Sequence, residues 1–428
     1  MLEPKVPKQK SGGMSENEPH VLHYNSWLTA GRPPLVALAS WIFEALTPPA
    51  ITPGRKHRAD AEGRRKACIA TLAANLVMVT LSPARYIGVA VPLRNLKLSR
   101  YVRSKFSADV LRAAIAQLEE VEFIAVQPAV FKEQRTVIAP TASFRDMVTG
   151  MRVSLADILH LEGRETIELW AGSPRRHNKV EIDYEDCADA DRLRAEMAVI
   201  NRVLNSADIR FDGMPVGPIH IVRNFHTEQP RGVATFNRHG RLYGGFWEHL
   251  PKDRRHLLTI AGEAVVDLDF VSMFIQLAYC RAGVQPPEGD LYAIPGLKDY
   301  RKAVKSVMVS LFFRESEAKR LPASDRETLP KGWSMERFKA AATAFHPSIA
   351  YLFDTDVGFQ LMAMESEILV AILLELAAKG IAGLPMHDGI MVGAGHKGIA
   401  MATMLKISEM KLGRSLPVAE KPVLQPAK

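Results

Sequence analysis

The clearest hydrophobic pattern lies in the C-terminal half of the chain, where two apolar segments carry acidic residues at their ends. Segment 264–270 reads Ala-Val-Val-Asp-Leu-Asp-Phe and predicts a strand. Side chains two residues apart point to the same face of a strand, so Asp267 and Asp269 share a face. Segment 384–392 predicts two short strands around a tight turn, with Asp388 at its tip. Carboxylates placed at the ends of buried strands are costly unless they are paired or bind a cation.

Between these acidic strands, the residues from 299 to 315 predict a helix with an unusual face. Arg301 and Lys305 are four residues apart, and Phe313 follows eight residues later, so all three share one side of the helix. Two cations and an aromatic ring on one face could hold a triphosphate and stack on a base. A solvated helix face is the alternative. Apolar residues at helical spacing over 362–376 predict a core helix, and we leave open whether Glu365 within it faces a cleft.

The N-terminal half has a different pattern. Residues 1–30 are polar and aperiodic and predict a flexible leader. Further on, a helix after Ser107, a strand at 123–126, a charged hairpin tip containing Lys132 and Arg135, and a return strand resemble the second half of a winged helix. That fold places a helix in the major groove of DNA and its wing on the backbone, although winged helices also bind proteins.

Charge supports a nucleic-acid partner for this half. The chain has 428 residues and a net charge of +8. Residues 1–100 hold 14 Lys and Arg against 6 Asp and Glu, whereas the remaining residues hold 41 of each. Arg55, Arg64 and Arg65 lie in two basic clusters that we expect to contact phosphates. A solubilising tail and a solvated helix start are the alternative interpretations.

Composition excludes several other classes. The cysteines Cys68, Cys187 and Cys280 are far apart, which argues against a disulfide scaffold or a cysteine-based zinc site and fits a cytoplasmic protein. The first residues do not resemble a secretory signal. The longest uncharged run, 67–84, contains threonines, an asparagine and a proline, so we expect a buried helix and no membrane partner.

Taken together, the two acidic strands and the basic helix resemble the family A DNA polymerases and their single-subunit RNA polymerase relatives. The resemblance covers roughly residues 236–428. The family's first motif, D-Y-S-x-x-E-L-R, corresponds to Asp269–Gln276, which reads D-F-V-S-M-F-I-Q here. The second, R-x-x-x-K-x-x-x-F/M-x-x-x-Y-G, corresponds to Arg301, Lys305, Val309 and Phe313. The third, V-H-D-E, corresponds to Met386–Gly389, which reads M-H-D-G. Weaker similarities surround Arg241, Arg254 and Asp290. Phe313 and Arg314 replace the family's Tyr-Gly, and Gly389 replaces its second acid.

The resemblance implies a role for each of these residues. Two Mg²⁺ ions, or Mn²⁺ in their place, would lie on Asp269 and Asp388, with Asp267 as a third ligand or as an acid that orients Asp269. The remaining implied contacts are Arg301 and Lys305 with the triphosphate, Phe313 with the nascent base pair, Phe274 with the sugar, His387 with the primer end, and Arg241 and Arg254 with the nucleic-acid backbone. The bulk of Phe274 would favour deoxynucleotides.

We therefore expect an α+β fold: a polymerase palm with small helical fingers, preceded by a helical and winged-helix-like DNA-binding region. The expected parts are a leader at 1–30, a DNA-binding domain at 31–150, a connecting or thumb-like region at 151–235 and a catalytic domain at 236–428. The expected function is that of a DNA polymerase without a proofreading exonuclease, which acts on a DNA primer–template and nucleoside triphosphates. We expect the protein to be encoded by a bacterium, a phage or a mobile element, and replication proteins could be its partners. Two alternatives are open: a primase or RNA polymerase with the same palm, and a non-enzymatic replication initiator that only binds DNA.

Overall fold

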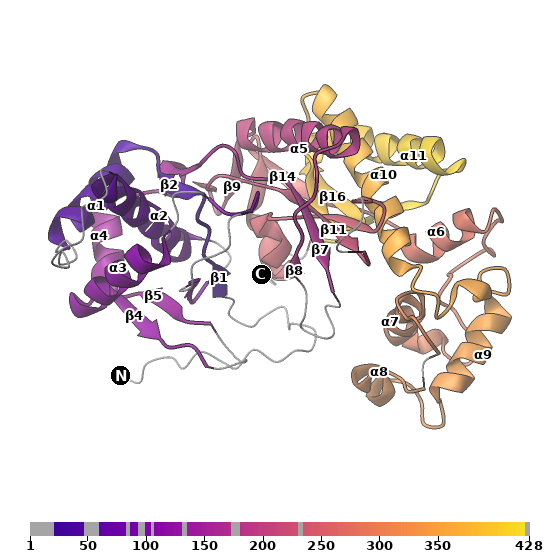
Figure 1. Cartoon of the computed structure of the whole chain (residues 1–428). Helices are drawn as coiled ribbons and strands as arrows, with labels where there is room; N and C mark the ends of the chain where they lie inside the picture. The colour runs from indigo at the N-terminus through magenta and orange to yellow at the C-terminus, as the bar shows by residue number, and fades with distance from the viewer. Residues whose placement is uncertain are drawn as a thin grey trace.

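The computed structural model describes residues 21–46, 60–82, 86–92, 99–103, 107–130, 135–172, 180–229, 234–317 and 319–423. Arg55 and Lys132 lie outside the described residues. The fold mixes helices with four separate sheets, which agrees with the expected α+β class (Figure 1). In the described part of the chain, no helix is both long enough and apolar enough to cross a membrane.

An N-terminal body packs four helices against two small sheets. The longest helix, α2, is buried along most of its length, and its Asn75 is satisfied there because the amide binds the backbone N–H and C=O of Asn25 at 2.8 and 2.9 Å. The hydroxyl of Ser107 accepts from the N–H of Val110 and so caps α3. The elements of this body are α1 (Pro33–Ala45), α2 (Ala61–Leu81), α3 (Ala108–Glu120), α4 (Ala142–Gly150), the sheet β1 (Val21–His23), β3 (Gly88–Ala90), β5 (Val137–Pro140) and β4 (Ile124–Gln127), and the pair β2 (Leu28–Ala30) and β6 (Ile158–His160).

The rest of the chain is built around a seven-stranded sheet. Its strands are β10 (Met214–Pro215), β9 (Ile209–Phe211), β13 (Leu258–Ile260), β14 (Glu263–Phe270), β16 (Gly389–Gly393) and β15 (Leu384–Met386), with β17 (Val418–Lys421) also paired to β14. A second sheet holds β12 (His239–Tyr243), β11 (Val222–Thr227), β7 (Ile167–Ala171) and β8 (Val180–Glu181).

Helices join and cover these sheets. The longest of them, α10 (Gly358–Ala378), packs against β12, α5, α6 and α11, so it links the two sheets. In Figure 1, α7, α8 and α9 form a separate lobe at the opposite side of the large sheet from the N-terminal body. The other helices are α5 (Ala188–Ser206), α6 (Met273–Arg281), α7 (Arg301–Phe312), α8 (Ala323–Thr328), α9 (Met335–Phe345) and α11 (Lys397–Leu412).

The expected elements around the acidic residues are confirmed. The strand predicted at 264–270 is β14, the hairpin predicted at 384–392 is β15 and β16, and the helix expected at 299–315 is α7. The alternation of β14 buries Asp267 and Asp269 on one face while Leu268 packs into the core on the other.

The described residues form two hydrophobic cores. One contains residues from Leu28 to Ile158, and the other contains residues from Ile167 to Leu416. Strands β1 and β2 therefore belong to the N-terminal body, and much of the region from 167 to 235 shares its core with the acidic strands. The domain boundaries at 30, 150 and 235 stay predictions.

A pair of histidines lies where the two cores meet. The rings of His160, on β6, and His220, just before β11, are stacked with centroids 4.1 Å apart. Burial, followed by the charge of Arg164, lowers the pKa of His160 to about 4, and burial, followed by the charges of His160 and Arg164, lowers that of His220 to about 2. Both rings are consequently neutral in the folded protein at neutral pH.

This stack predicts loss of stability in weak acid. The unfolded chain protonates both histidines near pH 6.5, whereas the folded chain protonates His160 only near pH 4 and His220 only near pH 2, so the free energy of unfolding should fall as the pH drops below about 6.5, by up to about 5 kcal/mol at pH 4.5. We expect His220→Phe to reduce this decline, and His396→Gln, which lies outside the stack, to leave it unchanged. Thermal unfolding from pH 7.5 to pH 4.5 measures the effect, and an equal decline in all three proteins would contradict it.

Candidate functional site

Two carboxylates meet at the centre of the large sheet. Asp269 lies on β14 directly opposite Gly389 on β16, and Asp388 immediately precedes Gly389 in the turn. The turn is tight because His387 adopts a left-handed conformation with φ 57°. A Cβ atom at Gly389 would lie 2.5 Å from the carbonyl oxygen of Leu268 and 2.7 Å from Oδ1 of Asp269. Glycine at this position is therefore what allows the hairpin to approach Asp269.

The pKa of Asp269 is raised, as expected for a carboxylate whose negative charge is only partly balanced by its neighbours. Burial, and then the charge of Asp388, raise the pKa of Asp269 to about 7, against the attraction of Lys421. The Oδ2 atom of Asp269 forms an ion pair with Lys421, and its buried Oδ1 atom has no hydrogen-bond partner among the described residues. An unpartnered buried carboxylate oxygen beside a second carboxylate is a favourable position for a cation.

The donor set fits magnesium better than a softer metal. Within the described ranges, no group of three or more His, Cys, Asp or Glu side chains is arranged to hold a metal ion. Magnesium commonly takes one or two protein carboxylates and completes its octahedron with water and phosphate oxygens. Asp269 and Asp388 match that requirement, and Mn²⁺ accepts similar oxygen ligands.

Asp267 lies on the same face of β14 as Asp269 but has a partner of its own. Its Oδ2 atom is 3.4 Å from Nη1 of Arg255. Burial raises the pKa of Asp267, while Lys421 and Arg255 oppose the shift. Whether Asp267 is a third ligand or an orienting acid stays a prediction, and the pair with Arg255 favours the second role.

A buried ion pair lies beside the two carboxylates. Arg241, on β12, donates from Nε to Oε2 of Glu365 at 2.9 Å and from Nη2 to Oε1 at 3.1 Å. The side chain of Glu365 is 0% exposed. Burial raises the pKa of Glu365 to about 7, Arg241 opposes this, and the charges of Asp388 and Asp269 raise it further. The pair is therefore within electrostatic reach of the acidic strands.

Phe274 and Phe313, two of the predicted nucleotide contacts, lie together beside Arg241. The guanidinium carbon of Arg241 is 5.6 Å from the ring centroid of Phe274, and the Phe274 and Phe313 centroids are 5.6 Å apart. Phe313 in turn packs on the first turn of α10, where a Cβ at Gly358 would lie 2.6 Å from its ring. A continuous aromatic wall thus extends from Arg241 to the end of α7.

The two predicted phosphate-binding cations are exposed on the first turns of α7. Arg301 donates from Nε and Nη2 to the carboxylate of Asp290 at 2.7 and 3.1 Å, and its guanidinium carbon is 5.2 Å from the ring centroid of Tyr292. Tyr292 is buried, and burial raises the pKa of its hydroxyl, with Asp388 adding to the shift. Lys305 lies one turn further along α7.

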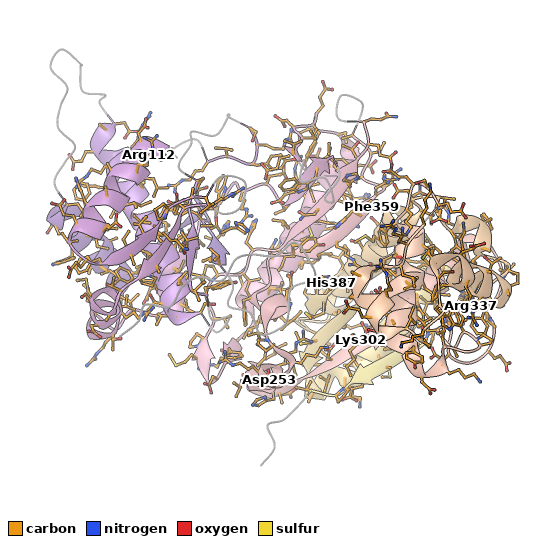
Figure 2. The ribbon with its side chains drawn as sticks, turned by 90° about the horizontal axis from the view of Figure 1, so that it is seen from below. Arg112, Asp253, Lys302, Arg337, Phe359 and His387 are labelled. Carbon is orange, nitrogen blue, oxygen red and sulfur yellow. The ribbon has the colours of Figure 1, made fainter. Side chains whose placement is uncertain are left out.

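The predicted nucleic-acid contacts are distributed over the molecule. His387 lies at the middle of the molecule in Figure 2 and is exposed as a residue, but partial desolvation of its ring, followed by the charge of Arg241, lowers its pKa to about 4. Arg254 lies over the ring of Phe211, with its guanidinium carbon 4.9 Å from the centroid. These two residues and Arg241 belong to the part of the chain that carries the acidic strands.

The described cations of the N-terminal body have mixed surroundings. Arg64 forms an ion pair with Asp60 at 3.6 Å, and Arg135 is exposed just before β5. Arg65 donates to the backbone carbonyls of Phe43 and Leu46 and lies over the Phe43 ring at 4.3 Å. Arg65 therefore holds the C-terminal end of α1, and Arg64 and Arg135 are better placed to meet a phosphate.

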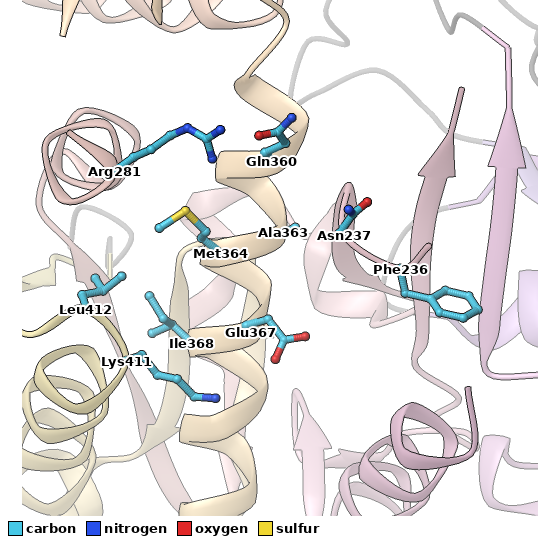
Figure 3. Close-up of a pocket in the computed structure, with 10 residues that line it drawn as sticks. All are labelled: Phe236, Asn237, Arg281, Gln360, Ala363, Met364, Glu367, Ile368, Lys411 and Leu412. Carbon is cyan, nitrogen blue, oxygen red and sulfur yellow. The ribbon is translucent and has the colours of Figure 1, made fainter. Parts of the chain in front are cut away.

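The structure also contains a groove of about 580 Å³ along the outer face of α10, and the predicted site residues do not line it. Figure 3 shows Arg281 and Lys411 on one side of α10 and Phe236 and Asn237 on the other.

Comparison with known proteins gives little further information. No protein-family model matches the chain, and no curated protein matches its sequence. Among solved structures, the chain is similar to the POL domain of Pol1 from M. smegmatis in complex with DNA primer-template and dNTP, with a TM-score of 0.32 and 12% identity over 54% of this chain. The match spans half of that structure's chain, 50%, and at this TM-score it carries no argument about function.

Most of the expected site residues thus come together, and some contributors were not expected. Asp269, Asp388, Asp267, Arg241, Phe274, Phe313 and His387 lie in one region. The sequence left Glu365 open; the available signal was an acid at a core-facing position of an apolar helical run. Lys421 and Arg255 carry no sequence signal of their own because their contacts with the acids depend on strand pairing and tertiary packing.

The Arg241–Glu365 pair predicts a large cost for removing its acid. Glu365→Ala leaves a guanidinium mostly buried without its carboxylate, which should destabilise the fold by about 3 kcal/mol or more. The control is Glu375→Ala, because Glu375 lies on the same helix as Glu365 but pairs at the surface with Lys379 and Lys406. Its loss should change stability by less than about 0.5 kcal/mol. Urea unfolding followed by circular dichroism compares the variants, and equal midpoints would contradict the prediction.

Proposed function

We propose that this chain is a template-directed nucleotidyltransferase that extends a 3′-hydroxyl with nucleoside triphosphates. The observation that carries the proposal is the pair Asp269 and Asp388, two carboxylates brought together by adjacent strands, with a buried, unpartnered Oδ1 atom on Asp269. A binding module has no need for such a costly arrangement. A site that holds cations against triphosphate oxygens does.

In this proposal each side chain has a specific task. Asp269 and Asp388 hold two Mg²⁺ ions, which when bound supply charge stabilisation for the developing oxyanion and the pyrophosphate leaving group. Asp267, fixed by Arg255, orients β14. Arg241, fixed by Glu365, supports Phe274 below the sugar, and His387 contacts the primer end. Positioning and charge stabilisation together account for the rate increase.

The exposed face of α7 would receive the triphosphate. Arg301 now binds Asp290 in a bidentate manner, and a phosphate group offers the same planar pair of acceptor oxygens. Lys305, one turn away, adds a second positive charge. We propose that Arg301 exchanges Asp290 for phosphate when the lobe formed by α7, α8 and α9 approaches the sheet, in the manner of small polymerase fingers.

The N-terminal body would hold the template duplex. The strand order, with β5 between β3 and β4, and the helix α3 that precedes β4 support the resemblance to a winged helix. Helix α3, however, carries Arg112 as its only cation against Asp109, Glu119 and Glu120, so we do not place it in a major groove. We propose that the start of α2, at Arg64, and the strand start at Arg135 contact the phosphate backbone instead.

The first prediction concerns the two carboxylates. Asp269→Asn and Asp388→Asn should each reduce primer extension with Mg²⁺ by at least about 10²–10³-fold, because each removes charge that stabilises the transition state. Asp253→Asn, an exposed acid outside the site, is the matched control and should extend normally. Binding of a labelled primer–template should be unchanged in all three.

Template-dependent extension that survives in both site variants would refute the proposal. Salt-sensitive DNA binding without extension in the wild type, with either deoxy- or ribonucleotides, would favour the initiator alternative.

A second prediction concerns the sugar. Phe274 is held between Arg241 and Phe313, so its ring is fixed where the resemblance places a 2′-hydroxyl. Phe274→Gly should reduce discrimination against ribonucleotides by at least about tenfold. Steady-state extension with each dNTP and its matching NTP measures this ratio. The control is Phe359→Leu on α10, whose ring centroid lies 5.4 Å from that of Phe313. A wild type that already accepts both sugars equally would favour the primase alternative.

A further inference from the structure

We propose that Lys421 is a built-in counter-ion that holds Oδ2 of Asp269, beside the open position at Oδ1, until a metal ion that uses both carboxylate oxygens displaces it. This inference rests on the proposed metal site at Asp269 and Asp388, and it concerns a residue to which neither the sequence motifs nor the comparisons assign a role.

Strand pairing places Lys421 at this site. β17 runs antiparallel to β14 with Lys421 directly opposite Asp267 and Ala419 opposite Asp269. Directly opposed residues of paired strands project to the same face of the sheet, so the lysine side chain emerges on the face that carries both acids. Its ammonium forms an ion pair with Oδ2 of Asp269. The neighbouring pair between Lys397 and Glu420 fastens β17 to the start of α11.

The three cations around the acids differ in how readily they can leave. The side chains of Arg255, bound to Asp267, and Arg241, bound to Glu365, are 13% and 19% exposed. The side chain of Lys421 is 51% exposed, whereas Asp269 is 11% exposed. A lysine with a flexible stem and a half-exposed position can move its ammonium into water at small cost, whereas an arginine packed in the interior cannot.

Charge explains why the lysine must move. An ammonium and a divalent cation on one carboxylate repel each other, so a metal that uses both oxygens of Asp269 has to displace Lys421. Without metal, Lys421 reduces the repulsion between Asp269 and Asp388 and allows the hairpin to form. The result is a site that is stable before it is loaded and that binds metal more weakly than the bare carboxylates would.

The test is metal binding by the full-length chain without nucleic acid or nucleotide. Mn²⁺ is titrated at pH 7.5 and free Mn²⁺ is measured by electron paramagnetic resonance, which is independent of catalysis. Lys421→Met keeps the length of the side chain and removes its charge, and it should bind Mn²⁺ about five- to tenfold more tightly. Lys421→Arg should retain an affinity close to that of the wild type.

Lys406→Met is the matched control. Lys406 is also a half-exposed lysine in an ion pair, 3.4 Å from Glu375, but it lies away from the acids, so its loss should leave Mn²⁺ affinity unchanged. Thermal unfolding provides a second readout. Without metal, Lys421→Met should melt at a lower temperature than the wild type, and saturating Mn²⁺ should remove most of that difference.

Equal or weaker Mn²⁺ binding by Lys421→Met, with a normal circular dichroism spectrum, would overturn the inference. An Asp269→Asn variant separates this result from failure of the proposed function. Mn²⁺ binding that persists in Asp269→Asn would show that the carboxylate is not the metal site, and both proposals would fail. Tighter binding by Lys421→Met together with no nucleotidyl transfer in the wild type would support the role of Lys421 and refute the polymerase.

Discussion

The repulsion between Asp269 and Asp388 is the constraint around which the C-terminal half of the molecule is organised. Two carboxylates on adjacent strands of a mostly buried sheet would not remain together without compensation. The sheet brings them together through many backbone hydrogen bonds and a large apolar core, and the glycine at 389 removes the side chain that would otherwise keep the strands apart. Burial and the charge of Asp388 raise the pKa of Asp269 although Lys421 opposes the shift, so the charge of Lys421 compensates the repulsion only in part.

Helix α10 contacts the groups that surround the two acids. It supplies Glu365 for Arg241, and its first turn receives the ring of Phe313 at Gly358. A single rigid element thus fixes the arginine beside the acids and the aromatic wall that extends toward α7. Because α10 also packs against β12 and α6, a change in its position would move both the Arg241 pair and Phe274. The site depends on this helix although the sequence marks it mainly as core.

The sequence was informative where chemistry coincides with local periodicity. Alternation over 264–270 and a turn flanked by apolar residues at 384–392 are local patterns, so the strands and the shared face of the acids could be predicted. The partners of the acids could not, because they depend on which strands pair. Lys421 reaches Asp269 through a strand more than 140 residues further along the chain, and Arg255 reaches Asp267 from the short 3-10 helix Lys252–Leu257. Which basic side chains near the N-terminal end are exposed also depends on tertiary packing. Arg65 belongs to a basic cluster in the sequence, but in the structure its side chain donates to the backbone at the C-terminal end of α1.

The acids of the site differ in function because their partners differ in mobility. Asp267 and Glu365 each face an arginine packed in the interior, so their charges are matched by groups that cannot leave. Asp269 faces a half-exposed lysine and a second carboxylate, and one of its oxygens has no partner in the described structure. When a divalent cation approaches, Asp269 is therefore the acid that can exchange its counter-ion at low cost. Asp267 on the sheet and Glu365 on α10 keep theirs, and the packing of the counter-ion is what separates the structural carboxylates from the exchangeable one.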